Sequence, residues 1–273
     1  MKNLILIIAA VCCALFTMFM VLTYNPTHKK TKTASTLQET SNSKNKLHNL
    51  NILFIGNSYT FFNNMPDMIL QIAQNDPNNP YNLYTQSITF GGARLQDHWN
   101  NKNTHNIIEK RKWDIIVLQE QSQWALYGDM IKNTAAHVAL FSKKAKQHKS
   151  FIMIYQTWPR QPHTHWYTSA EYKVATRSPE HMFNAIKSYT AKIASKNGAS
   201  TAPVGEYWYA TLQTNPEINL YGHDGTHPSM AGSYLAALVF YKYLTGNSPM
   251  DTSYIPKEVP KRHGETLKRI TSE

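Results

Sequence analysis

The feature that most constrains the fold is a regular alternation of short apolar segments with longer segments of helical patterning. Strand candidates are residues 50–55, 82–89, 114–119, 150–155 and 201–204, and helix candidates are residues 64–75, 95–111, 129–148, 180–197 and 229–245. Residues 115–118 are apolar at every position, which is typical of parallel strands covered on both faces. This alternation predicts an α/β fold with a mostly parallel five-stranded sheet.

Residues 1–24 contain a targeting signal. Lys2 is followed by 19 uncharged, mainly apolar residues from Leu4 to Leu22, close to the ~20 residues that span a bilayer. No small-x-small cleavage site follows Leu22, so we favour a transmembrane anchor over a cleaved signal segment. Three lysines between residues 29 and 32 oppose the positive-inside rule and leave the orientation open. We expect an exported domain on the periplasmic or extracellular face, tethered to the membrane or secreted.

Composition divides the remaining chain. Residues 25–47, rich in Thr, Lys, Ser and Asn, are expected to form a flexible polar linker. A compact domain is predicted over residues 48–250, followed by a basic, polar C-terminal tail over residues 251–273. Of the net charge of +11, residues 1–50 contribute six lysines and one glutamate. The domain lacks a dense basic stripe, so no nucleic-acid partner is expected. Both cysteines lie before residue 14, which excludes a cysteine nucleophile in the domain.

Polar residues that suit hydrolysis follow several predicted strands. Ser58 comes directly after the apolar run that ends at Gly56, a glycine pair at 91–92 follows the second strand, and Asp224 and His227 precede the last helix. Any of these alone is typical of a turn or a helix cap. In open α/β sheets, however, ligands bind beyond the carboxyl ends of the strands. Together the segments predict a site with a serine nucleophile, a histidine base and a carboxylate.

These segments resemble the conserved blocks of the SGNH (GDSL-type) hydrolase superfamily. Residues 56–60 (Gly-Asn-Ser-Tyr-Thr) resemble the block that contains the nucleophile, residues 90–95 the block with an oxyanion-hole glycine, and residues 224–228 (Asp-Gly-Thr-His-Pro) the block with the acid and the base. The resemblance spans about residues 50–245. It implies a flavodoxin-like three-layer α/β/α sandwich and a catalytic Ser58, Asp224 and His227. His223 is a neighbouring alternative base, off the family spacing.

Two departures from the family pattern stand out. Asn57 replaces a common Asp, which we expect to alter loop bonding more than chemistry. The third block usually ends in an Asn that donates to the oxyanion, whereas here residues 119–122 are Gln-Glu-Gln-Ser. Carbohydrate-esterase-like branches can use Gln at this position, and its amide offers the same donor. The resemblance therefore implies an oxyanion hole formed by the N–H groups of Ser58 and Gly92 and by Gln121, with Gln119 as the next candidate.

Residues 155–180 form an aromatic, histidine-rich stretch. We interpret it either as a surface loop that packs its rings on the sheet edge or as a substrate lid in which Trp158 and Trp166 stack on sugar rings. Gln119 is a further candidate substrate contact. His163 and His165 have no accompanying cysteine or well-spaced carboxylate, so we predict no metal and no cofactor.

The resulting hypothesis is a serine esterase that removes O-acetyl or other short acyl groups from a carbohydrate through an acyl-enzyme. One alternative is a lipase or lysophospholipase that acts at the membrane, and acyl transfer to a polysaccharide is a variant. Another is a catalytically inactive, glycan-binding protein that retains the fold, which the Gln-for-Asn difference keeps open. The predicted partners are an acylated carbohydrate or other small ester and, through residues 1–24, a membrane.

Overall fold

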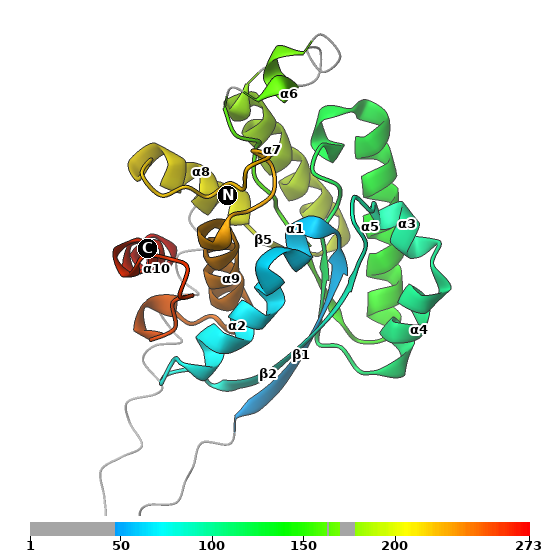
Figure 1. Cartoon of the computed structure of the whole chain (residues 1–273). Coiled ribbons are helices and arrows are strands. Elements are labelled where there is room, and N and C mark those ends of the chain that lie inside the picture. Colours follow the sequence, from blue (N-terminus) through cyan, green and yellow to red (C-terminus); the bar gives the residue numbers. More distant parts are fainter. Residues whose placement is uncertain (1–46, 163, 170–177) are drawn as a thin grey trace, which may run out of the picture. The chain divides into compact units, whose positions relative to one another are not determined.

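The domain is built on a five-stranded, wholly parallel sheet of order β2-β1-β3-β4-β5 (Figure 1). The structure, a computed structural model, describes residues 47–162, 164–169 and 178–273. The strands are β1 (His48–Gly56), β2 (Tyr81–Thr89), β3 (Ile115–Leu118), β4 (Phe151–Tyr155) and β5 (Ser200–Ala202). This strand order is that of flavodoxin-like folds, so the predicted fold class is confirmed.

Helices cover both faces of the sheet. The α-helices in the described part of the chain are α1 (Ser58–Phe61), α2 (Met65–Gln74), α3 (Leu95–Trp99), α4 (Lys102–Lys110), α5 (Gly128–Gln147), α6 (His165–Thr168), α7 (Pro179–Asn197), α8 (Val204–Thr214), α9 (Met230–Thr245) and α10 (Lys261–Ser272). The helix predicted over residues 95–111 is two helices, because Asn101 starts a new one by accepting a hydrogen bond from the N–H of Asn103 at 2.9 Å.

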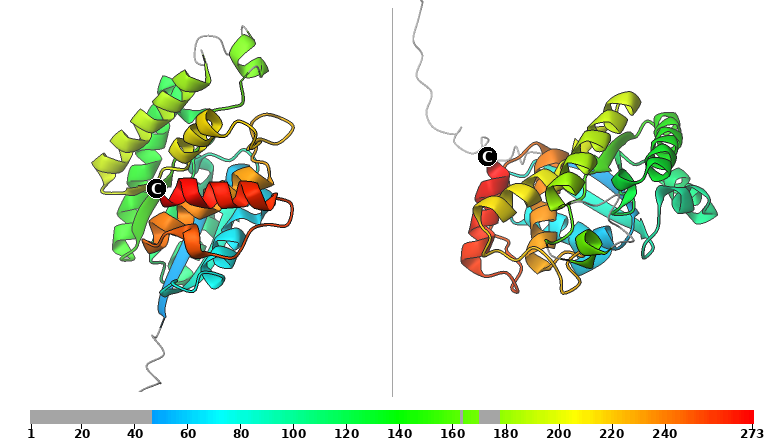
Figure 2. Two further views of the ribbon diagram at one scale, coloured as in Figure 1. Left: turned by 90° about the vertical axis from the view of Figure 1, so that its left-hand side faces the viewer. Right: turned by 90° about the horizontal axis from the view of Figure 1, so that it is seen from above.

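The segment 251–273, described from its sequence as a basic and polar tail, contains helix α10, which packs against α9 on the outside of the domain (Figure 2). Leu267 is fully buried, and the Nζ of Lys268 donates to the carbonyl of Thr252 at 2.9 Å. The buried Leu267 and the hydrogen-bonded, buried Lys268 thus hold α10 on the domain, although its other faces are polar. Its polar composition concealed it from sequence reasoning.

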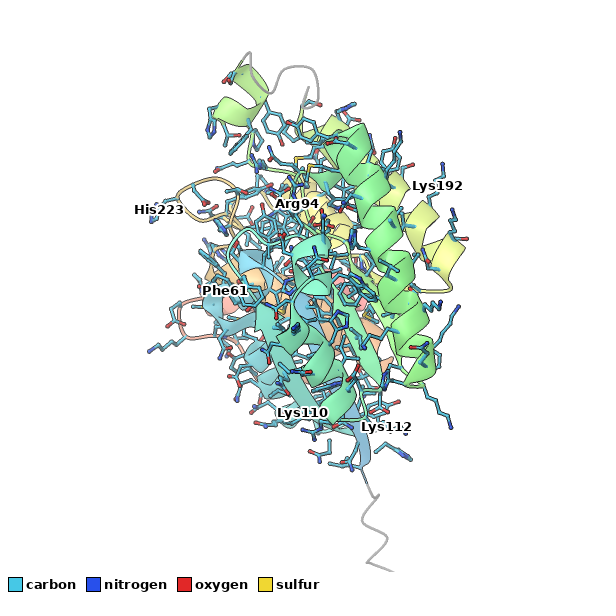
Figure 3. All side chains as sticks on the ribbon, turned by 90° about the vertical axis from the view of Figure 1, so that its right-hand side faces the viewer. Phe61, Arg94, Lys110, Lys112, Lys192 and His223 are labelled. Carbon is cyan, nitrogen blue, oxygen red and sulfur yellow. The ribbon has the colours of Figure 1, made fainter. Side chains whose placement is uncertain are left out.

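The two ends of the sheet differ in the residues that they present. The strands end near the loops that contain Arg94 and His223, whereas Lys110 and Lys112 lie at the opposite end, where β1 begins (Figure 3). In register, Gly56 of β1 lies opposite Thr89 of β2, and Ile55 lies opposite Leu118 of β3. The loops that follow these strands therefore meet at one end of the domain.

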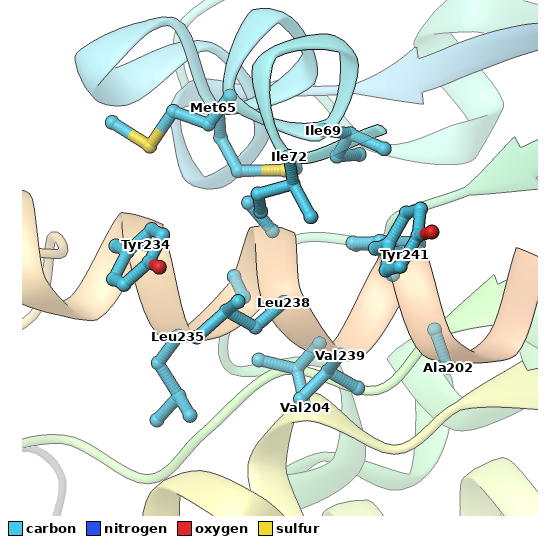
Figure 4. Packing of buried hydrophobic residues seen from close by; sticks show 14 of the residues in the cluster. Met65, Ile69, Ile72, Ala202, Val204, Tyr234, Leu235, Leu238, Val239 and Tyr241 are labelled. Atoms are coloured by element: carbon cyan, nitrogen blue, oxygen red, sulfur yellow. The ribbon is translucent and has the colours of Figure 1, made fainter. Parts of the chain in front are cut away.

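The core consists of two layers separated by the sheet. Ile52 and Phe54 of β1 pack on one face with α2, α8 and α9, while Leu53 and Ile55 pack on the other with α4, α5 and α7. All four side chains are fully buried, as the apolar run predicts. Figure 4 shows the first layer, in which α2 residues such as Ile69 face α9. This packing fixes the end of β1, from which Ser58 projects.

Residues 1–46 lie outside the described residues, and with them the predicted anchor and nearly all of the predicted linker. Within residues 47–162, 164–169 and 178–273, no helix has the length and apolar character that a membrane span requires. The predicted compact domain and the C-terminal segment belong to one unit, Asn45–Glu273.

Candidate active site

Ser58 lies at the first position of α1, directly beyond the end of β1. Asn57 caps this helix, and its Oδ1 accepts a hydrogen bond from the N–H of Tyr59 at 3.1 Å. Asn57 and Ser58 are both buried, at 3% and 9% exposure. A short helix that starts at the strand end therefore presents the hydroxyl from a rigid support.

His227 and Asp224 occupy the loop before α9. The Oδ1 of Asp224 accepts the backbone N–H groups of Thr226 at 3.0 Å and His227 at 2.9 Å. Gly225 between them has φ +67°, a conformation that favours glycine. The Asp224 side chain thus folds its own loop into a tight turn, and the second carboxylate oxygen remains available to the imidazole.

The three predicted residues lie in one hydrogen-bonded line. The Nδ1 of His227 is 2.5 Å from the Oδ2 of Asp224, and its Nε2 is 2.7 Å from the Oγ of Ser58. Because a carboxylate only accepts hydrogen bonds, we assign the imidazole proton to Nδ1. Nε2 then accepts the proton of the Ser58 hydroxyl, which is the arrangement that activates a serine nucleophile. His223, the alternative base, is exposed and lies outside this line.

The Asp224 carboxylate stays ionised under ordinary conditions. Burial alone would raise its pKa, but the hydrogen bond from His227 and the N–H groups of Thr226 and His227 outweigh that effect and lower the pKa. An ionised partner holds the Nδ1 proton in place and stabilises the imidazolium once His227 takes up a second proton.

Aromatic rings hold the imidazole in its plane. Phe62 stacks on His227 with ring centroids 4.2 Å apart, and the Tyr59 ring meets it edge-on at 5.5 Å. The hydroxyl of Tyr59 also bonds to that of Thr226, in the same loop as the imidazole. Sequence reasoning missed both rings, although the aromatic residues directly after Ser58 were the available signal.

Gln119 is not a substrate contact. Its side chain is buried, its Oε1 accepts from the N–H of Asn57 and the hydroxyl of Thr60 at 2.9 Å, and its Nε2 donates to Asn57 Oδ1 at 2.9 Å. Gly56 makes room for it, since a Cβ there would lie 2.6 Å from Gln119 Oε1. Gln119 thus positions the loop of Ser58, which corrects its predicted role.

Asn57 connects the loops after β1 and β2. Its Nδ2 donates to the carbonyl of Ala93 at 3.0 Å. An aspartate, common here in the family, would place a second acceptor against this carbonyl, so the structure accounts for the departure as a change in loop bonding. Gly92, next to Ala93, has φ +69° and is exposed.

The side chain of Gln121 is half-buried at the end of the same network. Its Oε1 accepts from the N–H of Gln123 at 2.7 Å, an arrangement that fixes the amide group. Within the described residues, the Nε2 of Gln121 and the backbone N–H groups of Ser58 and Gly92 have no protein acceptor. These three donors are the groups predicted to form the oxyanion hole.

Two buried ionisable groups support these loops from beneath. The Oε1 of Glu120 accepts the N–H groups of Leu95 at 3.2 Å and Gln121 at 2.8 Å. Burial raises its pKa, although these hydrogen bonds oppose the rise. His98 is fully buried, and its Nε2 lies 2.8 Å from the carbonyl of Gly56, while burial lowers its pKa. Neither residue was predicted from the sequence.

The predicted aromatic contacts differ from each other in exposure. Trp158 is fully buried between the rings of Tyr59 and Trp208, at centroid distances of 4.6 Å and 4.0 Å. It therefore has no face for a sugar, and its predicted role is corrected. Trp166 is half-buried, with the guanidinium of Arg160 3.4 Å from its ring centroid. His163, considered as a zinc ligand, lies outside the described residues.

Comparison with solved structures decides the family. A protein from Slackia heliotrinireducens that is assigned to the SGNH hydrolases is 31% identical, with a TM-score of 0.59, over 73% of this chain and 100% of its own. The chain belongs to the SGNH hydrolase superfamily. It is accordingly a serine hydrolase of the SGNH/GDSL type. No family model and no curated protein matches it.

More distant structures share the SGNH fold. A DUF4886 family protein from Bacteroides uniformis has a TM-score of 0.67 at 17% identity, over 82% of this chain and 93% of its own. An acetylxylan esterase from Geobacillus stearothermophilus has a TM-score of 0.57 at 14% identity, over 74% and 97%. At these identities the likeness shows a shared fold and no more.

Proposed function

We propose that this SGNH hydrolase is a serine esterase that removes O-acetyl or other short acyl groups from a carbohydrate. The observation that supports it most is the continuous line from Ser58 Oγ to His227 Nε2 at 2.7 Å and from His227 Nδ1 to Asp224 Oδ2 at 2.5 Å. Such a line is the arrangement in which a serine is activated to attack an acyl carbon.

The reaction proceeds in two halves. His227 Nε2 takes the hydroxyl proton as Ser58 Oγ bonds to the ester carbonyl carbon. The tetrahedral intermediate collapses, the bond to the sugar oxygen breaks, and His227 returns the proton to that oxygen. Water then attacks the acyl-Ser58 ester, gives a proton to His227, and the carboxylic acid leaves as Ser58 regains its proton. Asp224 stabilises the imidazolium in both halves.

The developing oxyanion is held by the donors that lack protein acceptors, namely the N–H groups of Ser58 and Gly92 and the Nε2 of Gln121. Losing one such donor commonly lowers kcat by about 10²–10³-fold. The hydrogen bond from the N–H of Gln123 fixes the longer Gln121 stem, so that the amide is preorganised as an asparagine would be.

A carbohydrate substrate is favoured by two observations. Acetylxylan esterases from Geobacillus stearothermophilus share this fold. Polar residues also follow the two neighbouring strands at this end of the sheet, Asn57 after β1 and the half-buried Gln121 after β3. Trp166 remains the candidate ring for a sugar contact. Arg160 covers one face of this half-buried ring, so a sugar would contact the part that Arg160 does not cover.

The proposed location is outside the cytoplasm, with the domain tethered to a membrane. This part of the proposal depends on residues 4–22, whose apolar length suits a bilayer span. An exported location would also bring the enzyme to acylated polymers outside the cell.

The decisive experiment treats the full chain with a fluorophosphonate probe. Wild type and the control Ser188→Ala, which alters an exposed serine of α7, are expected to be labelled, whereas Ser58→Ala is not. Acetate release from a panel of acetylated glycans then identifies the substrate. A folded wild type that neither labels nor hydrolyses would indicate a glycan-binding protein. Faster cleavage of long-chain than of short-chain aryl esters would indicate a lipase.

A further inference from the structure

The end of the domain opposite the active site is basic, because the fold brings together cations from three separate segments that form no dense stripe in the sequence. Because β3, β4 and β5 are parallel neighbours, the helices α4, α5 and α7 that precede them all end at this side of the sheet. The cations brought together there are Lys110, Arg111, Lys112, Lys146, Lys149 and Lys196, all exposed. Lys110 and Lys112 mark this end in Figure 3. We refer to these six residues and Phe151 as the basic end.

The charge of the basic end is not neutralised by its neighbours. Glu109 pairs with Lys144, which is not one of the six, at 2.5 Å. Asp114 accepts only the uncharged N–H and Nδ2 groups of Asn51, at 2.8 Å and 3.2 Å, so its single charge offsets at most one of the six cations. Among the described residues, Lys112 and Lys149 form no ion pair. Cations in a last helical turn are favoured by the helix dipole, which accounts for Lys110, Lys146 and Lys196. It does not account for Lys112 and Lys149, which lie beyond the helices.

An exposed aromatic ring projects from the same surface. Phe151, the first residue of β4, is 74% exposed, although it continues an apolar strand. It borders a groove of about 310 Å³ between the ends of α5 and α7, which Lys146 and Lys149 also line. An aromatic ring surrounded by lysines suits the boundary between lipid head groups and acyl chains, where both kinds of side chain are favoured.

The chain outside the described residues joins the domain at this end. The described chain starts at Leu47 and enters the sheet through His48, at the beginning of β1. Residues 23–46, 24 in number, separate it from the apolar residues 4–22. A flexible linker of that length has an average end-to-end distance of roughly 27 Å. A membrane that held residues 4–22 would therefore lie close to this end of the domain, which raises the effective concentration of its lipid head groups there.

We infer that the basic end docks on the anionic lipid head groups of the membrane that anchors the chain. The inference rests on the proposed insertion of residues 4–22. The cations bind lipid phosphates, Phe151 enters the head-group layer, and the active site at the opposite end of the strands faces away from the bilayer. The anchor alone would tether the domain in any orientation, whereas this surface selects one that presents Ser58 to a polymer outside the membrane.

The test is lysine footprinting of the full chain in lipid nanodiscs. A membrane-impermeant acetylating reagent is applied in discs of phosphatidylcholine alone and in discs with added phosphatidylglycerol, and each lysine is quantified by mass spectrometry. Labelling of Lys110, Lys112, Lys146 and Lys149 is expected to fall about fivefold in the anionic discs and to recover in high salt. Lys132 and Lys192, exposed on α5 and α7, serve as internal controls and keep their rates.

A matched pair of variants separates the surface from the overall charge. Lys146→Gln with Lys149→Gln should abolish the protection of Lys110 and Lys112, whereas Lys132→Gln with Lys192→Gln should preserve it. Circular dichroism checks that both fold. Equal labelling in the two discs, or equal protection of the control lysines, would overturn the inference. So would protection by soluble dextran sulfate without protection by anionic discs. Two measurements on the same samples separate the possible failures. Co-elution with the discs tests the proposed anchor, and esterase activity tests the proposed function.

Discussion

The two loops that meet at the active site are held in place in different ways. The loop of Ser58 is buried, and side chains from beyond β1 bond to it, above all Gln119 after β3. The loop of His227 lies nearer the surface, and the side chain of Asp224 is 48% exposed. Its turn is folded by hydrogen bonds within the loop, at 2.9–3.0 Å. A few longer-range bonds also hold it: the hydroxyls of Tyr59 and Thr226 bond to each other, Trp158 Nε1 donates to the carbonyl of Thr226 at 3.1 Å, and the N–H of Gln161 donates to the carbonyl of Gly225 at 2.8 Å.

Because of this difference, the position of Ser58 and the position of His227 depend on different parts of the structure. The position of the nucleophile is a property of the whole sheet, since it requires β1, β2 and β3 to end in register. The position of the base depends mainly on its own turn, which the Asp224 carboxylate folds, and on the few residues that contact this turn, among them Tyr59, Phe62 and Trp158. Substitutions around Ser58 should therefore reduce stability and activity together, whereas substitutions around His227 should reduce activity alone.

The largest effect is expected for Asp224→Asn. The amide keeps an acceptor for the backbone N–H groups, but it cannot hold the Nδ1 proton of His227, so the wrong tautomer forms. We expect kcat for an aryl acetate to fall by about 10⁴-fold, with an unchanged melting temperature. The control is Asp129→Asn, an exposed carboxylate in the first turn of α5. A large drop in melting temperature would show that the base loop is not locally determined.

The same substitution has a defined pH dependence. Hydrogen bonds lower the pKa of Asp224, so the carboxylate stays ionised to a lower pH than an ordinary aspartate. Its contribution is complete above the pKa of the unfolded state and is lost only as the pH falls through the lowered folded value. The difference in the free energy of unfolding between wild type and Asp224→Asn, measured in urea, should therefore not change between about pH 8 and pH 5.

Gln119→Leu should produce the largest loss of stability. Leucine fills the space but leaves the N–H of Asn57 and the hydroxyl of Thr60 without their buried acceptor. Each orphaned group costs about 1–3 kcal/mol, so the free energy of unfolding should fall by roughly 3 kcal/mol, and kcat should fall with it. Urea unfolding measures the first quantity, with exposed Gln213→Leu as the control. An unchanged stability would contradict the proposed dependence on the sheet.

His98 makes the support of the Ser58 loop sensitive to pH. Burial lowers its pKa, so below about pH 6.5 the unfolded chain binds a proton that the folded chain does not. Stability is complete above that pH and is lost as the pH falls toward the lowered folded value, by at most about 1.4 kcal/mol per pH unit. His98→Gln keeps a donor for the carbonyl of Gly56 but cannot titrate. Urea unfolding at neutral and acid pH should show a smaller loss in the variant than in wild type, and equal losses would refute this role.

The sequence predicted the fold and the residues of the hydrogen-bonded line because both have local signatures. Alternating apolar segments identify buried strands, and Asp224 and His227 sit at a characteristic spacing. Helix α8 was missed even though Val204, Trp208 and Thr211 are buried at helical spacing. Its start at Pro203, directly after a three-residue strand, concealed the periodicity.

The supporting residues could not be predicted, because their roles depend on contacts between distant segments. Gln119 and Gln121 look alike in the sequence. Gln119 can form its hydrogen bonds beneath the Ser58 loop only because Gly56 has no side chain in that space. Trp158 looked like a sugar platform, yet it lies in the core between Tyr59 and Trp208, since an aromatic residue in a loop has no periodicity to reveal its burial.

The smallest effect is expected for Phe62→Leu, which tests how local the base loop is. Leucine retains apolar contact with His227 but not the stacked ring at 4.2 Å, an interaction worth about 1 kcal/mol. We expect kcat to fall about fivefold, with a change in melting temperature too small to resolve. Phe151→Leu is the matched control, since that ring is 74% exposed and lies at the start of β4, at the opposite end of the sheet. Two results would contradict this expectation: an equal loss of activity in both variants, or a loss of stability comparable to that of Gln119→Leu. Either result would mean that the whole fold positions the imidazole, as it positions Ser58.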